Sequence, residues 1–151
     1  MPRLPPDSLA FALLHAADAV AAVASGRSLA DGLLAQVPAV ARPAVQDFVY
    51  STLRRHGRDA FFLGCLLTRP LGEPAVHALL LVALQRLETR PDNAHVTVNQ
   101  AVEAAGCVAG GRLRGLVNGV LRNFLRRREE LLAAAAADGT ASLCHPAWWV
   151  E

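Results

Sequence analysis

The sequence contains no lysine, because all fifteen of its basic side chains are arginines. Arginine suits phosphate contacts, since its planar guanidinium group can bind two oxygens at once. A lysine-free sequence rich in alanine and arginine is, however, also what coding bias produces, and a net charge of +2 is too small to define a nucleic-acid binder. Only the clustering of the arginines along the chain therefore carries information about function.

Aromatic residues make up 5% of the chain, and β-branched residues other than valine are scarce. Apolar residues nevertheless reach 53%, with alanine as the main contributor. Alanine and leucine favour helices, whereas β-branched and aromatic residues favour strands, so this composition predicts an all-α fold. A length of 151 residues fits one domain whose core needs neither disulfides nor a metal.

Cysteines are few, and Cys65, Cys107 and Cys144 are widely spaced among apolar or small residues. Their odd number and their spacing indicate neither a disulfide framework nor a zinc site. No apolar signal core opens the chain, and no run reaches the roughly 18 apolar residues that a membrane-spanning helix needs. We therefore expect reduced thiols, no metal, no membrane contact and a cytoplasmic protein.

The best-defined predicted helix is the stretch from Arg112 to Arg128. Apolar residues recur in it at the three- and four-residue spacing of one buried helical face. These residues are Leu113, Leu116, Val117, Val120, Leu121, Phe124 and Leu125. Asn118, Arg122 and Arg126 follow one another at i, i+4 on the opposite side, which must face water or a partner.

Two glycines, Gly115 and Gly119, lie beside the polar side of this helix. Each should cost a helix interior about 1 kcal/mol relative to alanine, so we expect something to pack close to the backbone there. The spacing favours a neighbouring helix, and the alternative is an RNA phosphate.

The arginines around this helix form the largest group that the core does not need, and they are our candidate RNA-binding site. The site residues are Arg112, Arg114, Asn118, Arg122 and Arg126. Arg127 and Arg128 rotate toward the apolar side, where we expect them only to snorkel. The alternative is a solvated surface on which Arg126 pairs with Glu130 one turn later.

Capping residues, prolines and glycines place six more helices before this one, which gives a bundle of about seven. Their expected ranges are 8–24, 28–37, 43–55, 60–67, 73–88 and 95–105. The fifth is apolar on nearly every side from Val76 to Leu84 and should form the buried centre of the bundle. We therefore expect Leu80 and Leu84 to lie in the core.

Three segments, taken in order and spacing, resemble the NusB-like fold, an all-helical domain found in the transcription antitermination factor NusB. They are EPAVHALLLVALQRLETRP, AHVTVNQAVEAAG and GLVNGVLRNFLRRREEL. They are also similar to the N-terminal domain of the Sun/Fmu (RsmB) methyltransferases, which make 5-methylcytosine in small-subunit ribosomal RNA. The upstream segments RSLADGLL and AVQDFVYSTLRR extend the resemblance to nearly the whole chain.

Two features favour the methyltransferase family. The terminal HPAWWVE resembles the junction that leads toward the catalytic domain in those enzymes, and the start of the chain offers only Arg3 where the antitermination factor carries an arginine-rich start. The resemblance implies that residues 1–137 are a NusB-like RNA-binding domain and that residues 138–151 begin a linker toward a C-terminal methyltransferase domain. It further implies S-adenosylmethionine as the parent protein's cofactor, with ribosomal RNA and that domain as partners.

The chain itself lacks a glycine-rich strand-to-helix turn for S-adenosylmethionine and the sequence context of an attacking cysteine. We therefore expect no catalytic and no cofactor-binding residue here. The leading hypothesis is an RNA-binding substrate-recognition domain. Two alternatives are a stand-alone antitermination factor and a helical docking or dimerisation module, for instance a homodimer, that makes no RNA contact.

Overall fold

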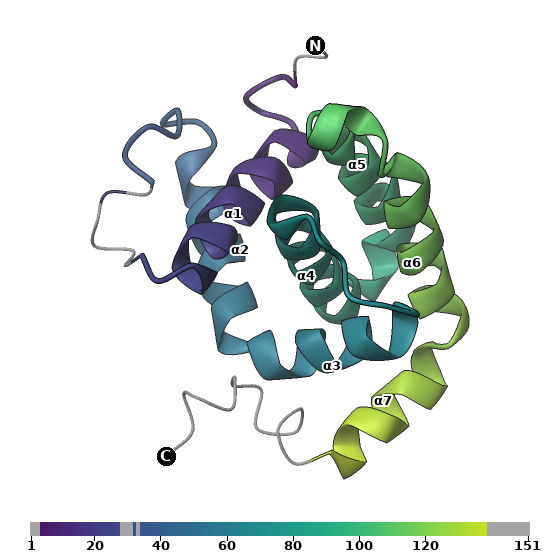
Figure 1. Cartoon of the computed structure of the whole chain (residues 1–151). Helices are drawn as coiled ribbons and strands as arrows, with labels where there is room; N and C mark the ends of the chain where they lie inside the picture. The colour runs from purple at the N-terminus through teal and green to yellow at the C-terminus, as the bar shows by residue number, and fades with distance from the viewer. Residues whose placement is uncertain (1–3, 28–31, 33, 139–151) are drawn as a thin grey trace.

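A computed structural model describes residues 4–27, 32 and 34–138 (Figure 1). Within these residues all regular secondary structure is helical, which confirms the predicted all-α fold. The α-helices are α1 (Leu9–Ala24), α2 (Arg42–Arg54), α3 (His56–Leu66), α4 (Pro74–Thr89), α5 (Ala94–Ala105), α6 (Arg114–Arg126) and α7 (Arg128–Ala137). Short 3-10 turns precede α5 and α6.

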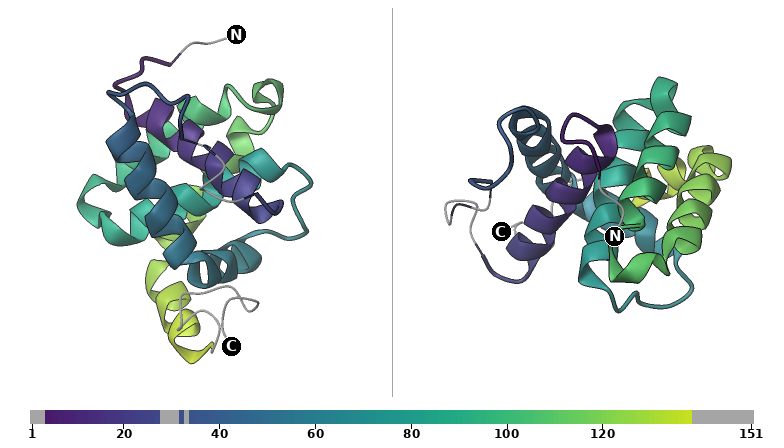
Figure 2. Two further views of the ribbon diagram at one scale, coloured as in Figure 1. Left: turned by 90° about the vertical axis from the view of Figure 1, so that its left-hand side faces the viewer. Right: turned by 90° about the horizontal axis from the view of Figure 1, so that it is seen from above.

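Helix α4 forms the centre of the bundle, as its apolar sequence predicts. It packs against α1, α2, α3, α5 and α6, and both Leu80 and Leu84 are completely buried. Figure 2 shows α1 lying between α2 and the α4–α5 part of the bundle, in agreement with its contacts to all three helices. Helices α2 and α6 therefore lie on opposite sides of the molecule (Figures 1 and 2).

Local signals place several helix ends correctly. The Ser8 hydroxyl caps α1 by accepting a hydrogen bond from the backbone N–H of Phe11 at 3.1 Å. Pro43 lies in the first turn of α2, where its missing N–H costs nothing. Pro74 begins α4 in the same way.

The helix predicted over residues 28–37 is not present at the residues of this range that the structure describes. Residues 28–31 and 33, which include the predicted cap, lie outside the described residues. Residues 34–37 form a turn, in which the Val37 N–H donates to the Leu34 carbonyl at 3.2 Å and the Ala35 N–H donates to the Gly32 carbonyl at 3.0 Å. Gly32 adopts a left-handed φ of +79° and Pro38 follows, so too few residues remain between them to nucleate a helix.

Helix α3 begins earlier than predicted. The sequence predicted a gap between helices over residues 56–59, but Gly57 in that gap is buried inside the first turn of α3, and Arg55 alone forms the junction with α2. The guanidinium groups of Arg55 and Arg58 both donate to the carboxylate of Glu88 on α4. These contacts fix the junction from outside the segment, which a local pattern does not reveal.

The predicted helix from Arg112 to Arg128 is divided in the structure. Arg112 precedes α6, and Arg127 interrupts the helix with φ −104° and ψ 17°. Arg128 then donates to the carbonyls of Leu87 and Glu88, at 3.0 and 3.1 Å, which satisfies the C-terminal end of α4. The alanine run therefore forms a separate helix, α7, that turns to contact α3 (Figure 1).

Candidate nucleic-acid interface

One side of α6 is buried in the bundle and the other is exposed. The buried residues Val117, Val120, Leu121 and Phe124 follow the predicted apolar face. On the opposite side, Arg114, Asn118, Arg122 and Arg126 succeed one another at i, i+4 and form a row about 18 Å long. All three arginines of this row are exposed. We refer to these four residues as the α6 basic row.

Two of the three arginines of the row, Arg122 and Arg126, are held by neutral amides. Arg122 donates from Nε to Asn118 Oδ1 at 2.9 Å, and Arg126 donates from Nη2 to Asn123 Oδ1 at 2.9 Å. Neither arginine forms an ion pair with a described residue. An amide oxygen orients a guanidinium group without cancelling its charge, so both charges remain available to an anion.

The alternative in which Arg126 pairs with Glu130 is wrong. Glu130 pairs instead with Arg127, at 2.8 Å, because the break at Arg127 places Glu130 on a different helix. The hydrogen bond between these two groups raises the pKa of Arg127 and lowers that of Glu130. Arg127 is thus neutralised by its own partner, and Arg126 is not.

Arg128 also lies outside the row, as expected. Its guanidinium carbon lies 5.7 Å from the centre of the Phe124 ring, and its nitrogens bind the end of α4. These contacts agree with the prediction that the Arg128 side chain turns toward the apolar side of the helix.

Arg112 and Arg114 sit at the start of the row in different surroundings. Arg112 lies before α6 and donates to Glu73 Oε1 at 2.6 Å, with 63% of its side chain exposed. Such an exposed pair contributes at most about 1 kcal/mol and competes weakly with a stronger anion. Arg114 lies over the tight turn before α6, where its Cδ would be 3.4 Å from a Cβ added at Gly106. The structure therefore keeps Arg114 in the row and places Arg112 at its margin.

The expectation that a neighbouring helix packs on Gly115 and Gly119 is wrong. A Cβ built at either glycine meets no described atom within 4 Å. Both glycines instead line an open groove of about 540 Å³ between α6 and residues 66–71, the connection from α3 to α4. The α6 groove, as we call it, has an α6 wall made of Leu113, Gly115, Leu116, Gly119, Val120 and Asn123.

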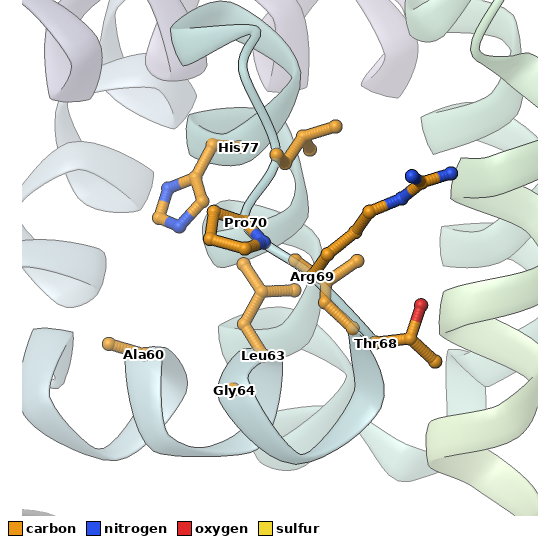
Figure 3. Close-up of a pocket in the computed structure, with 9 residues that line it drawn as sticks. Ala60, Leu63, Gly64, Thr68, Arg69, Pro70 and His77 are labelled. Carbon is orange, nitrogen blue, oxygen red and sulfur yellow. The ribbon is translucent and has the colours of Figure 1, made fainter.

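Two polar groups near this site were missed by sequence reasoning. Asn123 orients Arg126 and also lines the groove, and Arg69 lines the groove from the opposite wall. Figure 3 shows Arg69 extending from the connection toward α6, while His77 points the other way into a second hollow against α3. Arg69 follows the predicted helix 60–67, and nothing in the local sequence showed that α6 lies opposite it.

Other kinds of site are less developed. In the described ranges, no three histidine, cysteine or carboxylate side chains are grouped so that they could hold a metal ion. No helix of that part of the chain is long and apolar enough to cross a membrane. Asp59 is a completely buried carboxyl group in the first turn of α3. Burial, followed by the charge of Glu88, raises the pKa of Asp59 well above its ordinary value.

The all-helical fold is that of a NusB-like domain. Residues 9–126 match the NusB family, and the chain belongs to that family. The resemblance drawn from the sequence is therefore confirmed, including its link to the RsmB methyltransferases through the relatives described next.

Several relatives carry the name ribosomal RNA small subunit methyltransferase B. The protein from Erwinia tasmaniensis is 34% identical over 134 residues, which is 85% of this chain and 31% of the relative. The protein from Vibrio cholerae is 36% identical over 131 residues, covering 83% and 30%, and that from Pseudomonas putida is 37% identical over 141 residues, covering 89% and 32%. The chain thus spans about a third of the length of the curated relatives it matches.

Proposed function

We propose that this chain is the RNA-binding substrate-recognition domain of a small-subunit ribosomal RNA 5-methylcytosine methyltransferase, and that it is not catalytic by itself. Residues 1–137 form the domain, and residues 138–151 begin the linker toward the methyltransferase domain. The methyltransferase names of the relatives and the partial coverage of their length support this proposal over a stand-alone antitermination factor. The cytoplasm is the expected location.

The observation that carries the proposal is the α6 basic row. Arg114, Arg122 and Arg126 present positive charge along one helix face, and none of them is paired with a described carboxylate. Phosphate binding releases counterions and replaces the weak amide contacts of Arg122 and Arg126 with charge-assisted hydrogen bonds. The row therefore positions an RNA backbone, while Arg112 extends the contact at its margin.

This division of labour leaves chemistry to the rest of the parent protein. S-adenosylmethionine and the attacking group belong to its methyltransferase domain, and the domain described here holds ribosomal RNA for it. Backbone contacts of this kind fix the position of an RNA without reading its sequence.

The test is binding of small-subunit ribosomal RNA fragments over a range of salt concentrations. The double variant Arg122→Ala/Arg126→Ala should bind more weakly, and its logarithmic salt slope should fall by about 0.7 for each lost contact with a single strand. The matched control is Arg27→Ala/Arg54→Ala, which removes the same charge from exposed positions after α1 and at the end of α2, away from α6. Its salt slope should stay close to that of the parent chain.

Equal losses in both double variants would mean that only net charge matters. An unchanged affinity and slope in the α6 variant would place the RNA contact elsewhere, and no RNA binding by the parent chain would favour the docking-module alternative.

A further inference from the structure

The α6 groove lies directly beside the α6 basic row. Gly115 lines the groove and stands seven residues, or about two helical turns, before Arg122. Gly119 lines it too and stands seven residues before Arg126, so each glycine shares one side of α6 with an arginine of the row. Asn123 also joins the two features, because it lines the groove and accepts the hydrogen bond from Arg126.

The boundary between the row and the groove is kept low by sequence. Gly115 and Gly119 are less favourable in a helix than alanine, although an alanine Cβ would fit at both positions without a clash. Neither glycine has a positive φ, so backbone conformation does not require them. The glycines provide open space above the helix backbone, and a ligand held on the row can enter the groove across it.

The lining of the groove suits a flat ring that is attached to an anion. Leucines line both walls, and no carboxylate is among the described residues of the lining. Arg69 is the one charged residue of that lining, and it is exposed without a hydrogen bond or ion pair to any described residue. Its guanidinium plane can stack on a ring, while Thr68 and Asn123 supply hydrogen-bonding groups for the edge of the ring.

We propose that the α6 groove binds an unstacked base of a single-stranded RNA whose phosphates lie on the α6 basic row. This inference rests on the proposed function and adds a base contact to a site so far defined by backbone contacts. Proteins recognise single-stranded RNA largely through bases that are turned out of the stack and placed against aromatic rings or guanidinium planes. The groove volume of about 540 Å³ lies within the range of about 300–1,000 Å³ typical of ligand sites, which leaves room for a base.

RNA fits these observations better than an acidic protein segment does. Both would be attracted by the unpaired arginines on the two sides of the groove, Arg69 on one and Arg126 on the other. A nucleotide joins a phosphate to a flat ring through a ribose, so one strand uses the row, the open space over the glycines and the groove together. A peptide bound in the groove would leave the open space beside the row unexplained.

Binding of two RNAs that differ only in their bases tests the proposal. One is a single-stranded fragment of small-subunit ribosomal RNA, and the other is an abasic copy of the same length with the same number of phosphates. The parent chain should bind the abasic copy about tenfold more weakly, because the contact with the base is lost. The logarithmic salt slope should be the same for both, because every phosphate contact remains.

Variants that fill the groove should remove this preference. Gly119→Leu places a large side chain in the groove from an exposed helical position with free space around it. It should bind both RNAs equally, with the affinity of the parent chain for the abasic copy and with the salt slope of the parent. Gly115→Leu should do the same. Arg69→Lys keeps the charge but loses the planar guanidinium group, so it should reduce the preference at an unchanged slope.

Gly64→Leu is the matched control. Gly64 is also an exposed glycine inside a helix with no atom near an added Cβ, but it borders the hollow against α3 and not the α6 groove. This variant should keep the tenfold preference of the parent chain. Circular dichroism should show equal helix content in the parent chain and the three leucine variants.

Two results would overturn the groove inference alone. Equal affinity of the parent chain for both RNAs would show that no base is bound, and it would leave an acidic protein segment as the occupant. A preference that survives both groove variants would place the base contact elsewhere. The proposed function stands in either case if Arg122→Ala/Arg126→Ala still lowers the salt slope. No binding of either RNA by the parent chain would overturn the proposed function, and the groove inference with it.

Discussion

Arg122 donates from Nε to Asn118 Oδ1 one helical turn earlier, over 2.9 Å, on the exposed side of α6. Asn118 was predicted as an RNA contact of equal standing, whereas the structure shows its oxygen engaged in holding the arginine. Arg122 therefore provides the positive charge, and Asn118 positions the Arg122 guanidinium group.

The first prediction follows from that separation. Arg122→Ala should weaken RNA binding and lower the logarithmic salt slope by about 0.7, because one phosphate contact is lost. Asn118→Ala should weaken binding by no more than about 1 kcal/mol and leave the slope unchanged, since the charge remains. Both values come from the same salt titration. A reduced slope in Asn118→Ala would show that the amide does more than orient its neighbour.

The core of the bundle gives a second prediction. Leu80→Ala and Leu84→Ala should each lower the free energy of unfolding by about 2–5 kcal/mol, because both side chains are completely buried in α4. Val96→Ala serves as the control, since 49% of that residue is exposed and its loss should cost less than about 0.5 kcal/mol. Urea denaturation measures all three. Losses below about 1 kcal/mol at both leucines would contradict the central position of α4.

The sequence predicts a helix boundary when the residues that fix it are close in sequence, and it misses a boundary that a distant residue fixes. Helices α4 and α5 carry their own signals, a proline or capping turn at the start and an apolar face, and their ranges were predicted closely. The break between α6 and α7 carries none, because it depends on Arg128 reaching the carbonyls of Leu87 and Glu88 some forty residues earlier in the sequence. A helical period continues through Arg127 in the sequence although the helix does not.

In the candidate site, too, local spacing was predictable and contacts between distant segments were not. The exposed row on α6 follows from helical spacing alone, and so it was predictable. Whether Gly115 and Gly119 face a helix or a groove depends on the path of residues 66–71, and glycine propensity says nothing about what lies opposite. The contact of Asn123 with Arg126 was not predicted, because the sequence offered Glu130 as a partner for Arg126.

A third prediction concerns the cofactor. The chain should bind no S-adenosylmethionine and methylate no RNA, because its sequence has neither a strand-to-helix glycine turn nor an attacking cysteine in a suitable context. Isothermal titration calorimetry with S-adenosylmethionine is the measurement. Binding in the micromolar range would mean that the cofactor site includes this domain.

The fourth prediction concerns the junction between α2, α3 and α4. Glu88→Gln should lower the free energy of unfolding by about 1.5–3 kcal/mol, because only 7% of the Glu88 side chain is exposed and its charge-assisted hydrogen bonds with Arg55 and Arg58 are weakened. Glu130→Gln is the control, since it removes the carboxylate of an exposed pair with Arg127, and no measurable change is expected. Equal effects in thermal or chemical denaturation would show that the junction is not held by Glu88.

The last prediction concerns Asp59, in the first turn of α3. Neither of its carboxylate oxygens accepts a hydrogen bond from a described residue, and the side chain is inaccessible to solvent. Burial and the nearby charge of Glu88 raise its pKa well above the ordinary value of 3.8, and the opposing effects of Arg55 and Arg58 are smaller. Folding therefore takes up a proton at this position.

The sign of the pH dependence follows. Below pH 3.8 the folded and unfolded chains are both protonated at Asp59, so no stability is lost there. As the pH rises above 3.8, the unfolded chain releases the proton while the folded chain keeps it, and stability falls until the pH passes the raised pKa of the folded state. Asp59→Asn cannot ionise and avoids this loss. The stability of the variant relative to the parent should thus increase from acid toward neutral pH, as measured by urea denaturation at a series of pH values. A constant difference across that range would mean that Asp59 is ionised in the folded chain with an ordinary pKa.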